Sequence, residues 1–63
     1  MVSVIVEQWS NADGNTDFLW SLWQDGRRIH MGGKHDSAEA AEQEARLYCQ
    51  QALAVEPESV RIL

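Results

Sequence analysis

Three apolar, strand-like stretches precede one long helical pattern, and a fourth follows it. Runs rich in Val, Ile, Trp and Phe with period-two alternation are typical of half-buried strands. They predict strands over about residues 2–9, 18–24, 27–34 and 59–63. Apolar positions recur at helical spacing over about residues 37–55, and the first proline is Pro57, so this segment is predicted to be a helix.

The predicted helix has one apolar stripe and one polar, uncharged face. Asp36 and Ser37 are both good N-caps, and the carboxylate of Glu42 lies four residues from Arg46, within reach of an ion pair. The polar face carries Gln43, Leu47 and Gln51. We interpret it either as a solvated face with one exposed Leu or as a weak contact for a partner. The stripe consists of Ala38, Ala41, Ala45, Tyr48, Cys49, Ala52 and Leu53.

The dipeptide Asp25-Gly26 predicts a two-residue type I′ turn between the second and third strands. Such a turn sets the register, which places Trp23 opposite Arg28 and, two residues on, Ser21 opposite His30. One face of this hairpin is then predicted to carry Phe18, Trp20, Leu22, Ile29 and Met31, and the other Leu19, Ser21, Trp23, Arg28, His30 and Gly32.

These elements predict one α+β domain over residues 1–63, with the order β-β-β-α-β. A right-handed crossover through the helix returns the last strand parallel to the first. The expected sheet is therefore mostly antiparallel, with strand order 3-2-1-4 and the helix on one face. Val2, Val4 and Val6 are expected to face the helix.

This element order, with the helix opening Gly33-Lys34-His35-Asp36-Ser37-Ala38-Glu39-Ala40, resembles half of a ribonuclease-H-like fold, as in HicB-type antitoxins. The resemblance covers most of the chain but concerns only the order of the secondary-structure elements. No functional residue of that family is assigned to a position in this chain. A ribonuclease-H-like nuclease needs acidic residues at the centre of the first strand and the end of the fourth. This chain has Val4-Ile5-Val6 and Ser59-Val60-Arg61-Ile62-Leu63 at those places, so nuclease activity is not expected. HicB-type proteins usually carry a further DNA-binding segment, for which this chain is too short.

One helix covers one face of such a sheet, and the other face is too apolar for a solvated surface. Contiguous apolar patches usually mark interfaces, and Trp and Arg dominate the binding energy at many of them. This predicts an interface for a partner protein, for a second copy in a homodimer, or for both. The alternatives are that the strands turn their other face away from the helix, or that the loop of residues 10–17 folds over the patch. The candidate interaction residues are Ile5, Trp9, Leu19, Trp23, Arg28 and His30.

The third strand is basic within an acidic chain. Arg27, Arg28, His30, Lys34 and His35 all belong to it or follow it. Together with Trp23 they would suit a platform for single-stranded nucleic acid, which needs cations and stacking aromatics. They would equally suit an edge strand protected by charge against aggregation, and we favour this second interpretation.

Charge and composition narrow the classes of function. A net charge of −5 argues against general binding to nucleic acid or anionic membranes, although a nucleic-acid mimic stays open. A single Cys, Cys49, excludes an internal disulfide, and no Cys/His cluster, catalytic triad or phosphate loop is visible. We therefore expect no metal, no cofactor, no small-molecule ligand and no enzymatic activity. Residues 1–6 lack the basic start and length of a signal peptide, and no membrane span is present, so a cytoplasmic protein is expected.

The sequence thus predicts a small acidic, non-enzymatic protein–protein interaction module. Chains of this kind are typical of antitoxins and of inhibitors of phage, plasmid or bacterial origin that act by docking on a larger protein. This comparison rests on analogy of size and charge. The alternative is a single-stranded nucleic-acid binder that uses the Trp, Arg and His side chains of the hairpin.

Overall fold

A computed structural model describes all 63 residues and has six elements of secondary structure. Three long strands come first, then a helix whose last turn is of the π type, then a short strand. Their bounds are β1 Val2–Ser10, β2 Thr16–Gln24, β3 Arg27–His35, α1 Ala38–Tyr48, η1 Cys49–Leu53 and β4 Ser59–Ile62.

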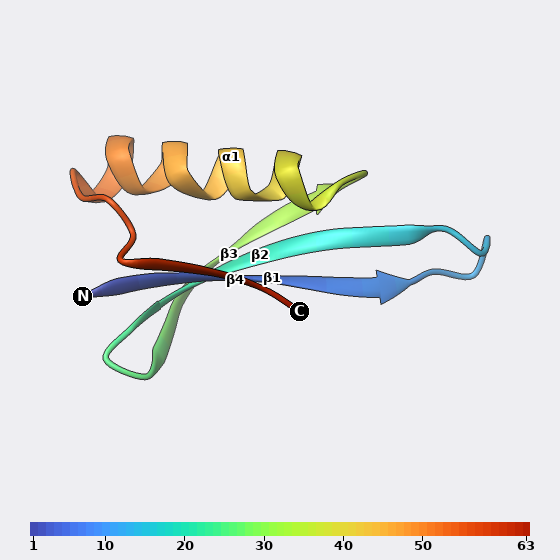
Figure 1. The fold of residues 1–63 in the computed structure, drawn as a ribbon, viewed down its shortest axis with the longest axis horizontal. Coiled ribbons are helices and arrows are strands. Elements are labelled where there is room, and N and C mark those ends of the chain that lie inside the picture. The colour runs from blue at the N-terminus through green and yellow to red at the C-terminus, as the bar shows by residue number, and fades with distance from the viewer.

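The four strands form one sheet in the order β3-β2-β1-β4, as predicted. β1 pairs antiparallel with β2 and parallel with β4, and β2 pairs antiparallel with β3. The helix lies across one face of the strongly twisted sheet, and no element covers the other face (Figure 1). The α+β class and the β-β-β-α-β layout are therefore confirmed.

The core lies between the sheet and the helix and is small. Val2, Val4 and Val6 alternate along β1 and are buried, as their spacing predicted. Trp20 and Leu22 of β2 lie beside them. The first part of the helical stripe closes this layer because its small side chains let the helix approach the sheet. Its buried members are Ala41, Ala45 and Cys49.

The hairpin between β2 and β3 begins as predicted and then departs from the predicted register. Asp25 and Gly26 both have positive φ, 53° and 80°, which is the type I′ geometry. Trp23 pairs with Arg28 as expected, but one extra residue, Ile29, follows in β3. The register then shifts again between Leu19 and Ser21 of β2. Such bulges change which residues of a strand face the core.

The second irregularity coincides with a close approach between β3 and the ring of Trp20. A Cβ atom added at Gly32 would overlap with Cε2, Nε1 and Cζ2 of the Trp20 indole, whereas one added at Gly33 would meet nothing within 4 Å. The indole of Trp20 occupies the space that a side chain at Gly32 would need.

The helix begins where the sequence predicted but is not α-helical throughout. Ser37 is the N-cap, and its side-chain Oγ accepts a hydrogen bond from the Ala40 amide at 3.1 Å. After Tyr48 the coil widens into the π turn and ends at Ala54, which has φ 55°. The wider turn rotates the residues in it, and Ala52 and Leu53 are exposed although both were predicted to lie on the buried stripe.

The connection between β1 and β2 is shorter than the predicted loop of residues 10–17. Pairing continues to Ser10 and Thr16, so only residues 11–15 are outside the strands. The side-chain oxygen of Asn11 accepts hydrogen bonds from the amides of Asp13 and Asn15, at 2.9 and 3.1 Å. This turn stays at the end of the hairpin and does not fold over the sheet (Figure 1).

Candidate interaction surface

The sheet face that points away from the helix is the main candidate surface, and we call it the open face. On β1 and β2 it consists of the residues that alternate with the buried ones, because successive side chains of a strand point to opposite faces. On β3 and β4 it includes the residues paired with these positions. Its members are Ser3, Ile5, Glu7, Trp9, Asp17, Leu19, Ser21, Trp23, Arg28, Met31, Lys34, Ser59 and Arg61.

Five of the six residues predicted for this surface lie on the open face. Ile5, Leu19 and Trp23 are half-buried in its centre, Trp9 lies at one end, and the exposed Arg28 lies at the β3 edge. The sequence missed Met31, because the predicted register assigned it to the helix side.

Trp23 lies over the sheet and is fixed there by a side-chain contact. Its Nε1 donates a hydrogen bond to Oγ of Ser21 at 2.8 Å. Ser21 is only 2% exposed although it is on the uncovered side, because the neighbouring side chains cover it. The hydroxyl of Ser21 also lies 3.5 Å from the carbonyl oxygen of Ile5. The centre of the open face is therefore already ordered without a partner.

Trp9 differs from Trp23 because nothing holds its ring. It is 58% exposed, and β4 ends its pairing with β1 at Val6, so the last residues of β1 have no paired strand on that side. A hollow of about 440 Å³ lies there, lined by Glu7, Gln8, Trp9 and Leu63. The exposed indole next to this hollow is the most accessible aromatic contact of the protein.

Three cations surround the centre of the open face, and none has a carboxylate partner. Arg28 and Lys34 lie on the β3 edge, and Arg61 lies on the β4 edge. None of the three occurs among the ion pairs of the molecule. Arg46 on the helix, in contrast, pairs with Glu42 at 2.9 Å, as its spacing predicted. The sequence analysis named Lys34 in the basic third strand but did not include Lys34 or Arg61 among the candidate interaction residues, and Arg61 reaches this face through the pairing of β4 with β1.

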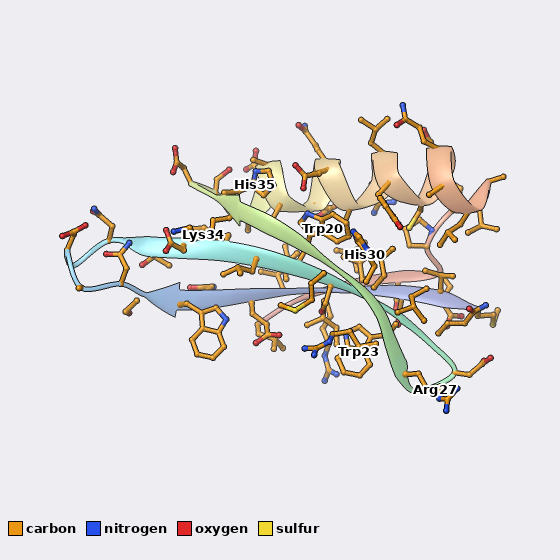
Figure 2. The ribbon with its side chains drawn as sticks, turned by 180° about the vertical axis from the view of Figure 1, so that it is seen from behind. Trp20, Trp23, Arg27, His30, Lys34 and His35 are labelled. Atoms are coloured by element: carbon orange, nitrogen blue, oxygen red, sulfur yellow. The ribbon has the colours of Figure 1, made fainter.

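The placement of His30 on the open face is wrong. The extra residue Ile29 shifts the register, so His30 pairs with Leu22 and points to the helix side. Its imidazole stacks on the ring of Tyr48 with centroids 4.2 Å apart and an interplanar angle of 8°. Figure 2 shows Trp20 and His30 between the sheet and the helix, and Trp23 on the opposite side.

A polar cluster that the sequence did not predict joins β2, the end of β3 and the helix. The Trp20 Nε1 donates a hydrogen bond to Oε1 of Glu44 at 2.9 Å. Nε2 of His35 lies 3.0 Å from the other oxygen of Glu44, close enough for an ion pair but without the alignment of a hydrogen bond. The hydrogen bond from Trp20 and, less strongly, His35 lower the pKa of Glu44, against the opposing effect of desolvation.

This cluster stabilises the packing of the helix on the sheet and does not present a reactive group. The carboxylate of Glu44 is already engaged by two side chains, and its lowered pKa keeps it ionised, so it is a poor general acid or base. A hollow of about 340 Å³ lies beside it between β3 and the helix. The lining residues are Trp20, His30, Met31, Gly32, Gly33, Glu44, Leu47, Tyr48 and Gln51.

The second predicted surface, on the helix, is exposed and small. Gln43, Leu47 and Gln51 are all exposed, and Leu47 is the only apolar side chain among them. Leu47 and Gln51 border the hollow beside Tyr48, whereas Gln43 does not. One exposed Leu among amides gives little apolar area for a contact.

Cys49 is buried in the core, and the histidines belong to no metal-binding cluster. The thiol of Cys49 is buried in the core, and burial raises its pKa, which disfavours the reactive thiolate. No group of three or more His, Cys, Asp or Glu residues has a geometry that could hold a metal ion. No helix is long and apolar enough to cross a membrane.

Known proteins add no functional information. No protein-family model, no curated protein and no solved structure matches this chain, so its likeness to half of a ribonuclease-H-like fold remains a resemblance of layout.

Proposed function

We propose that this protein is a non-enzymatic protein–protein interaction module that docks through the open face. The observation that supports this most directly is the combination of uncovered apolar side chains and unpaired cations on one face of a two-layer domain. Trp9 and Met31 are 58% and 45% exposed. Exposed aromatic, Met and Arg side chains are the ones enriched at protein interfaces.

The area of the open face is sufficient for a small protein–protein interface. Four strands about 4.8 Å apart and about six residues of β1, at about 3.3 Å each, give roughly 20 Å by 20 Å, or about 400 Å². Covering this face would bury on the order of 1,000 Å² from both partners together, at the lower limit for specific complexes. We therefore expect a transient or regulatory contact rather than a permanent one.

The class of inhibitors and antitoxins remains our proposal for the biological role. Such proteins act by occupying a surface of a larger protein, which needs no reactive group of their own. The small size, the net charge of −5 and the pre-ordered centre of the open face are compatible with this role. A homodimer through the same face, and a cytoplasmic location, remain predictions.

Binding of single-stranded nucleic acid is the weaker alternative. His30, one of the side chains proposed for it, stacks on Tyr48 on the other side of the sheet. Trp9 lies six positions along β1 from Ser3, the partner of Trp23, so the backbones that carry the two indoles are about 20 Å apart at about 3.3 Å per residue. Successive stacked bases need aromatic rings much closer together than this.

The proposal is tested by comparing three chains: wild type, Trp9→Ala and Leu47→Ala. Trp9 and Leu47 are about equally exposed, 58% and 51%, but lie on opposite sides of the protein. Solution mass by light scattering and capture of partners from bacterial lysate are measured for each. We expect Trp9→Ala to stay folded and to weaken dimerisation or capture, while Leu47→Ala behaves as wild type. If Trp9→Ala changes neither, or if Leu47→Ala removes the interaction instead, the open face is not the docking surface.

A further inference from the structure

We infer that the open face binds an acidic segment of a protein partner, in which apolar side chains are flanked by Asp or Glu. This inference rests on the proposed docking function and adds the chemistry of the partner. In this arrangement the partner's apolar groups cover Ile5 and Leu19, and its carboxylates reach Arg28, Lys34 and Arg61.

The distribution of charge over the molecule is the first reason. The open face carries three of the five Lys and Arg residues, but only two of the ten carboxylates, Glu7 and Asp17. A protein with net charge −5 thus has one face with more cations than carboxylates. The other acidic residues lie in the turns, in the connection before β4 and on the helix.

The second reason is that the three cations are free to pair. They lie at the two edges of the face and form no ion pair within the chain. An exposed ion pair is worth little in isolation, but a partner that covers the apolar centre also removes water from the rim. Carboxylates at matching positions would then select the register of the partner.

The acidic helix does not cancel this effect at physiological ionic strength. Glu39, Glu42 and Glu44 lie on the helix, on the far side of the sheet from a bound partner. The helix has a diameter of about 10 Å. The Coulomb energy between two charges falls as their distance grows, so these carboxylates act on a bound partner more weakly than the charges that it touches. The nearest charges to a partner on the open face are therefore those of the face itself.

A second copy of the chain is a less suitable occupant. Consider first a face-to-face dimer whose two-fold axis runs parallel to the strands. In it the β3 edge of one copy lies over the β4 edge of the other. Met31 then faces Arg61, with Lys34 and Arg28 beside it. In a dimer whose two-fold axis runs perpendicular to the strands, β3 of one copy lies over β3 of the other. Arg28 of each copy then faces Lys34 of the other. Both arrangements bring cations toward cations, which disfavours the complex.

Nucleic acid is also less suitable, although it too is anionic. Glu7 lies next to Leu19 within the face, so a phosphate chain that crosses the face would approach a carboxylate. Three cations would also release few counterions on binding. A peptide chain can avoid Glu7 by placing an apolar or polar residue there, which a phosphate backbone cannot do.

The test uses a displayed library of random 12-residue peptides, selected on wild type and on three charge-reversal variants. Lys34→Glu and Arg61→Glu change the open face. Arg27→Glu is the matched control, because Arg27 is an exposed residue of β3 without an ion pair and is paired with Gln24, on the helix side of the sheet. Circular dichroism confirms that each variant is folded. Selected peptides are synthesised, and their affinities are measured at low and high salt and in competition with dT12.

We expect wild type and Arg27→Glu to select peptides that contain more Asp and Glu than the library, next to apolar residues. Lys34→Glu and Arg61→Glu should each weaken binding of these peptides about tenfold, since an attraction is replaced by a repulsion. Trp9→Ala should weaken it as well. Selected peptides without an acidic bias that still need Trp9 would overturn the inference and leave the docking function intact. No selection by wild type, or displacement by dT12 at physiological salt, would overturn both.

Discussion

The contact between Gly32 and the ring of Trp20 gives the sharpest prediction for the fold. Replacing Gly32 with Ala adds one methyl group to β3. That methyl would overlap with three atoms of the indole. The ring cannot move aside easily, because Trp20 is 2% exposed and its Nε1 is hydrogen-bonded to Glu44. Either β3 or the helix must shift to accept the methyl group.

The expected loss is large relative to the stability of so small a domain. Forcing an extra methyl group into a packed core typically costs 1–3 kcal/mol, and we expect about 3 kcal/mol here because two secondary-structure elements hold the ring. A domain of 63 residues is stable by roughly 3–9 kcal/mol in total. With a urea m-value of about 1 kcal/mol/M, the midpoint should fall by about 3 M.

Gly33→Ala is the matched control, since it adds the same methyl group one residue further along. Nothing lies within 4 Å of that position and its φ is not positive, so we expect a change of about 0.5 kcal/mol in either direction. Urea unfolding of both variants is followed by circular dichroism at 222 nm. A third chain, Trp20→Phe with Gly32→Ala, should recover part of the loss because the smaller ring leaves room. Equal urea midpoints for the two Gly variants would show that the ring of Trp20 does not lie against Gly32.

Three further predictions concern the helix and its contacts with the sheet. Because the pKa of Glu44 is lowered in the folded state, its ionised carboxylate stabilises the folded protein at pH values above the ordinary pKa of about 4.5. This stabilisation is lost as the pH falls through the pKa of the folded state. Glu44→Gln should thus lower stability by about 0.5–1 kcal/mol at pH 7, allowing for its exposure. A gap from wild type in urea unfolding that does not narrow as the pH falls below about 4.5 would contradict this. Ser37→Ala removes the N-cap and should cost about 1 kcal/mol, whereas Ser37→Asp should cost little in the same assay. His30→Ala should lower stability by about 1 kcal/mol, because its stacking on Tyr48 is lost. In wild type we expect nuclear Overhauser contacts between the two rings, and their absence would place His30 on the open face.

The sequence by itself determined the elements, their order and the topology of the sheet. Alternation of Val2, Val4 and Val6 fixed which face of β1 is buried, and Asp25-Gly26 fixed the first hairpin pairs. Both signals are local, because a strand has a period of two and a type I′ turn needs two residues with positive φ. The small residues of the helix likewise identified its buried side.

The tertiary structure alone decided the register of β3 beyond its first pairs. Two irregularities in β3 accommodate the extra residue Ile29 and the indole of Trp20, which passes under Gly32. The extra residue Ile29 exchanges His30 and Met31 between the two faces, so the candidate site lost one predicted residue and gained another. The second irregularity, opposite Trp20, shifts the register back, and Lys34 lies on the same face as Arg28. No period in the sequence marks such bulges, because they depend on how the two strands pack against each other.

The ring of cations on the open face was likewise decided only by tertiary structure. Arg28, Lys34 and Arg61 come from two strands at opposite edges of the sheet, and only the pairing of β4 with β1 puts Arg61 on the same face as the other two. Residues 33 positions apart in the chain share a face only when the sheet brings their strands together, so the basic third strand alone could not indicate that Arg61 lies on the same face.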